Sequence, residues 1–243
     1  MSIDIAVVLV GAFLASVVSG SSGFAFGLIG SAIWLHVLPP GRVVPLVVIC
    51  SMLLNLALVW RLRHEVRPRL LWPFLAGALI GVPIGVASLK RMDPEVLRRG
   101  VGALLLFYSI YMLRRPSMPV IRLGTIGGRI ADGSVGLLGG FMGGATSLNG
   151  LFPTMWCGLR GWNKTEQRGV FQPYILIVHA ITLFWLGGVG GLDMRTGRDV
   201  LLCLPALLIG GWLGLKLFHR VSDDGFRRVI LMLFLLSGLS LLF

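Results

Sequence analysis

The chain of 243 residues is 56% hydrophobic and 13% charged, whereas about 25% charged residues is typical of soluble domains. This composition excludes most soluble classes, and the high hydrophobicity also excludes intrinsic disorder. Apolar segments long enough to cross the hydrocarbon core of a bilayer recur along the whole sequence. The composition therefore predicts an all-α polytopic membrane protein.

The net charge of +12 comes from 22 Lys and Arg against 10 Asp and Glu. Most of the basic residues lie in short connections between apolar segments, where cations set membrane orientation. Orientation explains this charge better than nucleic-acid binding does, and attraction of an anionic substrate is the alternative source. The three cysteines stand far apart and form neither a disulfide framework nor a metal-binding pattern.

The apolar segments form two groups along the chain. They fall at roughly 5–18, 24–38, 43–60, 70–89, 96–113, 130–146, 147–159, 170–187, 199–218 and 227–243. A loop-like stretch rich in proline and glycine divides the chain nearly in half. We therefore expect a first repeat over 1–115, a linker over 116–128 and a second repeat over 129–243.

The two halves resemble each other in sequence. Four matches lie in the same order, namely 20–23 with 140–143, Pro45 with Pro173, 79–85 with 208–214, and 90–99 with 219–228. Random apolar sequence could mimic one such match, but several in the same order indicate an internal duplication.

The positive-inside rule distinguishes two topologies for these repeats. If the leading segment of each half crosses fully, the repeats are parallel and the cations divide 12 against 10. If it returns to the side it entered from, seven cations lie outside and fifteen inside. The second division is more asymmetric. It predicts two inverted repeats, each a re-entrant segment (5–38 and 130–159) followed by about three transmembrane helices. Both termini then lie outside, and the linker is cytoplasmic.

Each re-entrant segment contains a stretch rich in small residues, Ser19 to Gly27 in the first half and Gly139 to Gly150 in the second. Glycine disfavours the helix, and serine offers the backbone other hydrogen bonds, so both segments are expected to unwind there. A helix that restarts at such a turn presents a positive N-terminal end and free amides, which suit an anion.

Paired interruptions in two repeats are the best sequence indication of a transporter's binding site. Close helix packing through small residues is the alternative, and it suffices for a single cluster. Two clusters in register, with polar side chains beside them, favour a site. Its predicted residues are Gly20, Ser21, Ser22, Gly23, Gly143, Gly144, Thr146, Ser147 and Asn149.

These motifs resemble those of the TauE/SafE-type sulfite exporters, also called the toluene sulfonate uptake permease family. The resemblance spans essentially the whole chain. It rests on the clusters at 20–23 and 140–144, on Pro39-Pro40 and Pro153, and on the helix starts at 97–99 and 226–228. It implies a secondary transporter of sulfite, sulfonates or short carboxylates. Where the family often has Thr-Ser, this chain has Phe171-Gln172-Pro173-Tyr174, which makes Gln172 a candidate for specificity.

Other polar residues within the apolar segments allow two interpretations each. His179, two helical turns beyond Gln172, is the candidate carrier of a coupled proton; a neutral histidine bonded to a neighbouring helix is the alternative. Asn55 is assigned to helix contact, and Asp132 is expected to pair with Arg129. The cations flanking the re-entrant segments, expected to orient the protein unless they attract the anion, are Arg42, Lys164 and Arg168.

The leading hypothesis is a multi-pass inner-membrane transporter that moves a small anion by alternating access, with coupling to protons as a further expectation. An anion channel is the alternative, and only saturation and counterflow distinguish the two. An intramembrane enzyme acting on lipid-linked substrates would need a catalytic set, and no paired thiols, paired histidines or buried acid pair occur. We therefore expect no enzymatic activity, cofactor, metal or nucleic-acid partner.

Overall fold

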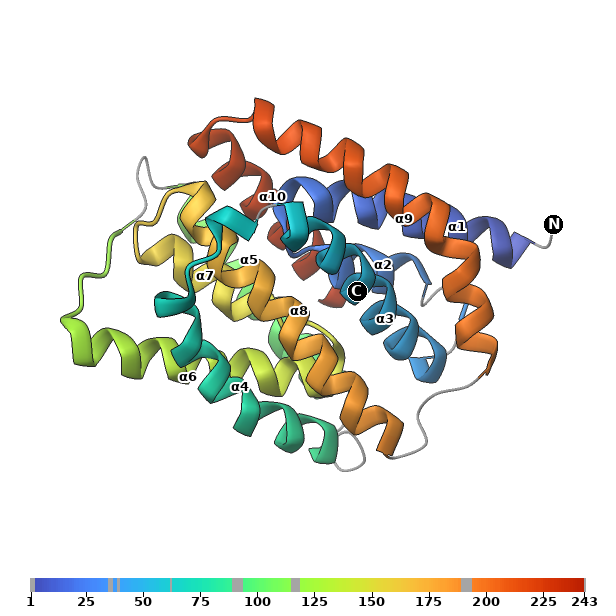
Figure 1. The fold of residues 1–243 in the computed structure, drawn as a ribbon, viewed down its shortest axis with the longest axis horizontal. Coiled ribbons are helices and arrows are strands. Elements are labelled where there is room, and N and C mark those ends of the chain that lie inside the picture. Colours follow the sequence, from blue (N-terminus) through green and yellow to red (C-terminus); the bar gives the residue numbers. More distant parts are fainter. Residues whose placement is uncertain are drawn as a thin grey trace.

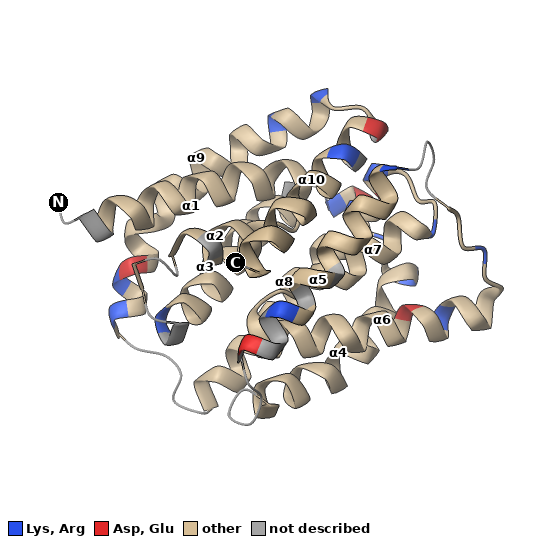
Figure 2. Cartoon of the chain, turned by 180° about the vertical axis from the view of Figure 1, so that it is seen from behind, with Lys and Arg blue, Asp and Glu red and all other residues tan. Residues whose placement is uncertain are grey.

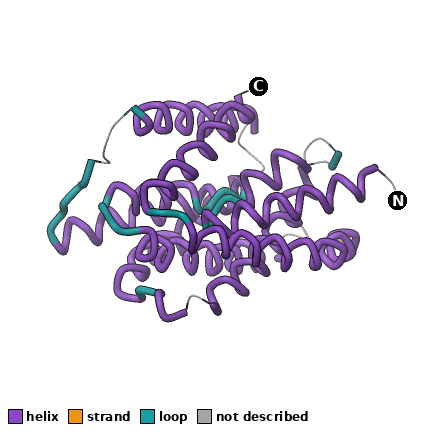
Figure 3. Tube along the Cα trace, turned by 90° about the horizontal axis from the view of Figure 1, so that it is seen from above, coloured by secondary structure: helices purple, strands orange, loops and turns teal. Residues whose placement is uncertain are grey.

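The computed structural model describes residues 3–34, 37–38, 40–61, 63–88, 94–114, 119–188 and 194–242. Within these ranges the chain forms ten α-helices and one 3-10 helix, with no strand (Figure 3). Some residues of the sequence motifs, Pro39, Lys90, Arg91 and Asp93, lie outside the described residues.

The helices follow the same order of lengths in both halves. The first half contains α1 (Ile3–Ser22), α2 (Phe26–Trp34), α3 (Pro40–Arg61), η1 (Arg63–Glu65), α4 (Pro68–Ser88) and α5 (Pro94–Leu113). The second half contains α6 (Thr125–Thr146), α7 (Leu151–Leu159), α8 (Lys164–Gly188), α9 (Met194–Arg220) and α10 (Asp223–Leu242). Each half thus has a long helix, a nine-residue helix and three more long helices.

Six of the described helices, α1, α3, α4, α8, α9 and α10, are long and apolar enough to cross a membrane. Charged residues lie mostly near helix ends and in the connections, leaving long uncharged stretches of helix (Figure 2). The predicted fold class, an all-α protein with several membrane-spanning helices, is confirmed. One boundary differs, because α6 begins at Thr125, within the predicted linker, where Gly124 in extended conformation forms the N-cap.

In the first half, α1 and α2 form a hairpin. The indole Nε1 of Trp34, at the end of α2, donates to the carbonyl of Val8 on α1 at 3.1 Å. Gly30 of α2 lies opposite Ala15, where an added Cβ would be 3.8 Å away. Since the end of α2 lies beside the beginning of α1, residues 23–25 form the tip of this hairpin.

The second half repeats this hairpin with α6 and α7. Trp156 of α7 donates its indole N–H to Asp132 of α6 at 2.6 Å, and Arg129 lies over the ring of Trp72 instead. The expected pair between Asp132 and Arg129 is therefore wrong, because Asp132 is buried against α7. The tip of this hairpin is formed by residues 147–150.

Each leading helix packs against a helix of the other half. The most extensive contacts join α6 to α4 and α1 to α9 (Figure 1). An added Cβ at Gly81 of α4 would lie 2.2 Å from the carbonyl of Leu137, and one at Gly214 of α9 would lie 2.2 Å from that of Val17. The matching sequence segments 79–85 and 208–214 therefore supply equivalent packing surfaces, of the small-residue type found between membrane helices.

Candidate functional site

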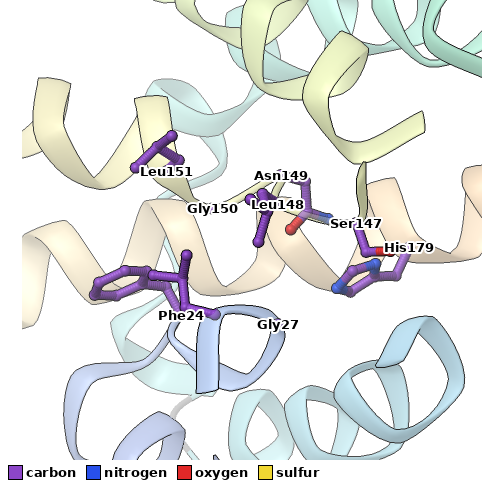
Figure 4. A pocket seen from close by; sticks show the side chains of 9 residues that line it. Phe24, Gly27, Ser147, Leu148, Asn149, Gly150, Leu151 and His179 are labelled. Carbon is purple, nitrogen blue, oxygen red and sulfur yellow. The ribbon is translucent and has the colours of Figure 1, made fainter. Parts of the chain in front are cut away.

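The two hairpin tips meet each other. A Cβ added to Gly27 would lie 3.3 Å from the carbonyl oxygen of Ser147, and one added to Gly150 would lie 3.0 Å from Cβ of Phe24. The interruptions that the sequence places in separate halves are thus neighbours in space. A pocket opens between them (Figure 4), and its lining residues are Phe24, Gly27, Leu28, Ser147, Leu148, Asn149, Gly150, Leu151 and His179.

Two short helices, α2 and α7, begin at these tips, and the residues that start them line the pocket. The first N–H groups of a helix have no partner within it, and the helix dipole makes this end partially positive. Gly150 is the N-cap of α7 and provides no side-chain cap, while Pro153 has no N–H to offer. At α7 the N–H of Leu151 donates to the carbonyl of Leu148 at 3.5 Å and that of Thr154 to the carbonyl of Gly150 at 3.0 Å, so Phe152 keeps the free donor of this turn. At α2 the N–H of Ile29 bonds to the carbonyl of Ala25 at 3.1 Å, and the N–H groups before it remain available to an acceptor in the pocket.

Ser147 ends α6 in an unusual conformation. Its φ of 67° lies in the left-handed region, and among the described residues it is the one non-glycine with positive φ. This conformation costs about 1–2 kcal/mol for an L-residue and normally favours glycine. The side chain is 2% exposed, lines the pocket and has no hydrogen-bond partner for its Oγ. A strained residue that keeps an unpartnered hydroxyl in a pocket is the pattern expected of a ligand-binding position.

Asn149 is the second predicted residue that lines the pocket (Figure 4). Its Nδ2 donates to the carbonyl of Ile175 on α8 at 3.2 Å. This bond fixes the amide between the tip and α8. A carboxamide held in this way presents a defined polar edge to the pocket.

The hydroxyls that precede the tips turn back onto their own helices. Ser21 and Ser22 both donate to the carbonyl of Val18, at 2.9 and 2.8 Å. Thr146 donates to the carbonyl of Met142 at 2.9 Å. Because these bonds are compatible with the helix, α1 continues to Ser22 and α6 to Thr146, and unwinding begins later than the sequence predicts.

Two of the predicted site glycines lie in the helix contacts between the halves. A Cβ added to Gly20 would be 2.6 Å from the carbonyl oxygen of Gly211, and one added to Gly144 would be 2.5 Å from that of Val82. The packing interpretation therefore accounts for Gly20 and Gly144 directly.

The other two site glycines lie against the tips. A Cβ on Gly143 would meet Cβ of Asn149 at 2.8 Å and Cγ1 of Val178 at 2.9 Å. Gly23 has a φ of 90°, and a Cβ there would be 2.7 Å from the ring of Phe171. Both glycines give the chain room to turn beside the pocket.

Gln172 is buried one helical turn beyond Arg168 on α8. The Nε of Arg168 donates to Oε1 of Gln172 at 2.8 Å, and its Nη2 donates to the carbonyl of Gly20 at 2.6 Å. The guanidinium carbon is 4.2 Å from the centroid of the Phe218 ring. Arg168 is only 1% exposed, so this predicted flanking cation lies inside the protein. Its four-residue spacing from Gln172 is the signal that places both on one helix face.

His179 lies at the opposite side of the pocket from Phe24 (Figure 4). It is 1% exposed, and its Nε2 is 3.1 Å from Oγ of Ser51 on α3. Asn55 also donates to Ser51, at 3.2 Å. The offset that matches Pro45 with Pro173 matches Ser51 with His179. Sequence analysis misses Ser51, although this offset identifies it as the counterpart of His179.

One face of α8 carries four buried polar side chains in two pairs, separated by Ile175. Arg168, Gln172, His179 and Thr182 are each at most 1% exposed, and their spacings of four, seven and three residues place them on the same face. Each has one buried atom without a partner, respectively Nη1, Nε2, Nδ1 and Oγ1. Since buried polar groups are nearly always bonded, these four atoms are donors or acceptors that a polar ligand or water could satisfy.

Among the described residues, no group of three His, Cys, Asp or Glu is placed to hold a metal ion.

The comparisons with known proteins agree with the resemblance seen in the motifs. The family described as Sulfite exporter TauE/SafE matches residues 8–241. No curated protein and no solved structure shows a significant match. The chain, a multi-pass membrane protein, belongs to the TauE/SafE sulfite exporter family of membrane transporters.

Proposed function

We propose that this protein is a secondary transporter that moves small organic or sulfur-containing anions across the inner membrane by alternating access. Sulfite, sulfonates and short carboxylates are the candidate substrates. Membership of a sulfite exporter family supports the class of function. The observation that carries the site is the contact between the two hairpin tips, with a pocket between them.

The substrate is held in this proposal by the backbone N–H groups at the starts of α2 and α7 and by the side chains of Ser147 and Asn149. Donors of this kind stabilise an oxyanion without a formal charge in the pocket itself. Gly23 and Gly143 provide space for the turns. The remaining predicted residues, which lie around the tips, are Gly20, Ser21, Ser22, Gly144, Thr146 and Gln172.

The arrangement of helices supports inverted repeats. Successive glycines of α4, Gly77, Gly81 and Gly85, meet successively later residues of α6, so these two helices run parallel. The same holds for α1 and α9. In Figure 1, however, α1 and α6, which occupy the same place in their halves, run in opposite directions. Equivalent helices with opposite directions are what an inverted duplication requires.

One polar contact joins the halves near the beginning of α9, where Asp199 pairs with Arg42 of α3 at 2.5 Å. Beyond the end of α9, Lys164 of α8 donates to the carbonyl of Val221, and this contact lies within the second half. In an alternating-access cycle, opening the pocket at the Arg42 end breaks the ion pair between the halves.

The proposed topology can be tested with single cysteines, because all three native cysteines are buried. Gly124 and Met194 are both exposed, and they precede α6 and α9. In intact cells a membrane-impermeant maleimide should label Met194→Cys, whereas Gly124→Cys should react only after permeabilisation. Labelling of both positions from the same side would contradict the re-entrant arrangement, because a fully crossing α6–α7 segment places them together.

The transport proposal predicts saturable uptake and counterflow in proteoliposomes for at least one of labelled sulfite, a sulfonate and a short carboxylate. Gly143→Leu should abolish this flux, because its side chain fills the space next to Asn149. Gly127→Leu, also on α6 but with no atom within 4 Å of its Cβ position, is the matched control. Normal flux in Gly143→Leu would remove the site, linear flux without exchange would indicate a channel, and no flux of any anion would refute the substrate class.

Proton coupling through His179 predicts that an imposed pH gradient drives anion uptake. His179→Gln retains a hydrogen-bonding group near Ser51 but cannot be protonated, so the gradient should no longer drive uptake, while anion exchange persists. His64→Gln, at an exposed histidine of η1, is the control and should behave as wild type. A gradient effect of equal size in His179→Gln would leave His179 a structural residue.

The strained Ser147 provides a test that separates stability from function. Ser147→Gly relieves the positive φ and should raise the free energy of unfolding by about 1 kcal/mol, whereas Ser147→Ala keeps the strain. Because both variants lack the hydroxyl, the KM for the transported anion should rise about tenfold, as expected for loss of one hydrogen bond to a charged ligand. Thermal unfolding in detergent and initial uptake rates provide the two measurements. An unchanged KM in both variants would show that the hydroxyl does not contact the substrate.

A further inference from the structure

We propose that Arg168 and Gln172 form a second oxyanion-binding site, located at the end of α1 next to the pocket. The statement that this anion is a transported substrate rests on the proposed function. Binding itself rests only on the contacts of the two side chains.

The bonds already made by the two side chains determine what they can still bind. Nε and Nη2 of Arg168 are used by Oε1 of Gln172 and by the carbonyl of Gly20. Nη1 of Arg168 and Nε2 of Gln172 are buried and have no partner. Both unused groups are donors and neither can accept, so their ligand must be an acceptor. An oxyanion with two or more oxygens can satisfy both donors.

The charge of Arg168 supports the same ligand. Among the described residues, no carboxylate lies within 4 Å of its guanidinium, although the side chain is 1% exposed. Glu65 lies beside the start of α8, because a Cβ added to Gly169 would be 2.1 Å from the backbone carbonyl oxygen of Glu65. The side-chain Oε2 of Glu65 is buried and also has no hydrogen-bond partner. Glu65 is the carboxylate whose charge acts on Arg168, but it forms no direct ion pair with the guanidinium. A buried cation without an ion pair is unfavourable, and a bound anion would supply that pair.

The position of Arg168 connects this site to the pocket. A Cβ on Gly23 would lie 3.2 Å from Nε of Arg168, so only glycine lets the guanidinium approach the tip this closely. The next residue, Phe24, lines the pocket, and its ring makes an edge contact with Phe171, with centroids 6.2 Å apart. Arg168 itself does not line the pocket. An anion held by Arg168 therefore lies next to the aromatic pair and reaches the pocket by passing the ring of Phe24.

A purely structural role is the competing explanation. The bond from Arg168 to Gly20 places a cation at the C-terminal end of α1, where it stabilises the helix dipole. In that case the remaining donors have no ligand, and the protein's affinity for oxyanions does not depend on Arg168. Equilibrium binding distinguishes the two roles, because helix capping does not change the number of bound anions.

The experiment measures binding of ³⁵S-sulfite to the purified full chain in detergent, at constant ionic strength. Wild type should show two classes of site, and Arg168→Gln should lose one of them. Gln172→Leu leaves the guanidinium of Arg168 bonded to Gly20 and removes one donor, so the sulfite affinity of one class of site should fall about tenfold. This variant also tests the proposal if Arg168→Gln does not fold. Arg63→Gln, at an exposed arginine between α3 and α4, should bind as wild type.

Isotherms of Arg168→Gln or Gln172→Leu that superimpose on the wild-type isotherm would overturn the proposal. Uptake by the same preparations in proteoliposomes separates this result from the proposed function. Transport with an unchanged isotherm in both variants would retain the transporter and remove the second site. Binding that depends on Arg168, in a chain that transports no anion, would retain the site and remove the transporter.

Discussion

The structure depends on one constraint, namely that a helix interrupted within a membrane must find partners for its freed backbone groups. Here the two interrupted hairpins solve the problem together, because the tip at 23–25 packs against the tip at 147–150. Neither half could provide this environment alone. The contact encloses the tips and leaves the starts of α2 and α7 facing a shared pocket, so the element that stabilises the interruption also creates the place for a ligand.

The abundance of glycine has two different physical causes in this fold. In the helix contacts between the halves, residues such as Gly81 and Gly214 bring backbones together, and any side chain would collide with a carbonyl. At the tips, Gly23 and Gly143 allow the chain to turn beside the pocket. The first group holds each leading helix against the other half. The second group can then form a site at a defined place, because the hairpins are fixed from outside.

The sequence predicts the fold class, the two groups of helices and the interruptions, because these follow from composition and from local preferences of glycine and serine. It does not predict where each interruption begins, since Ser22 and Thr146 bond back to their own helices and extend them. It also does not predict that Arg168 is buried, because the contact of Arg168 with Gly20 joins residues 148 positions apart. Periodicity within one helix carries no information about such a contact.

The two halves share an order of helices but differ in the polar side chains that they carry. Ser51 and His179 occupy positions that match in sequence, and they contact each other, as the proposed duplication requires of residues at its axis. Yet α8 carries Arg168 and Gln172, whereas the matching positions of α3 hold Pro40 and Val44. The second half therefore supplies most of the polar groups, and the first half mainly supplies shape. In the proposed transport cycle, the repeated order of helices would let both sides of the membrane open in similar ways, while α8 would provide side-chain donors that the anion meets.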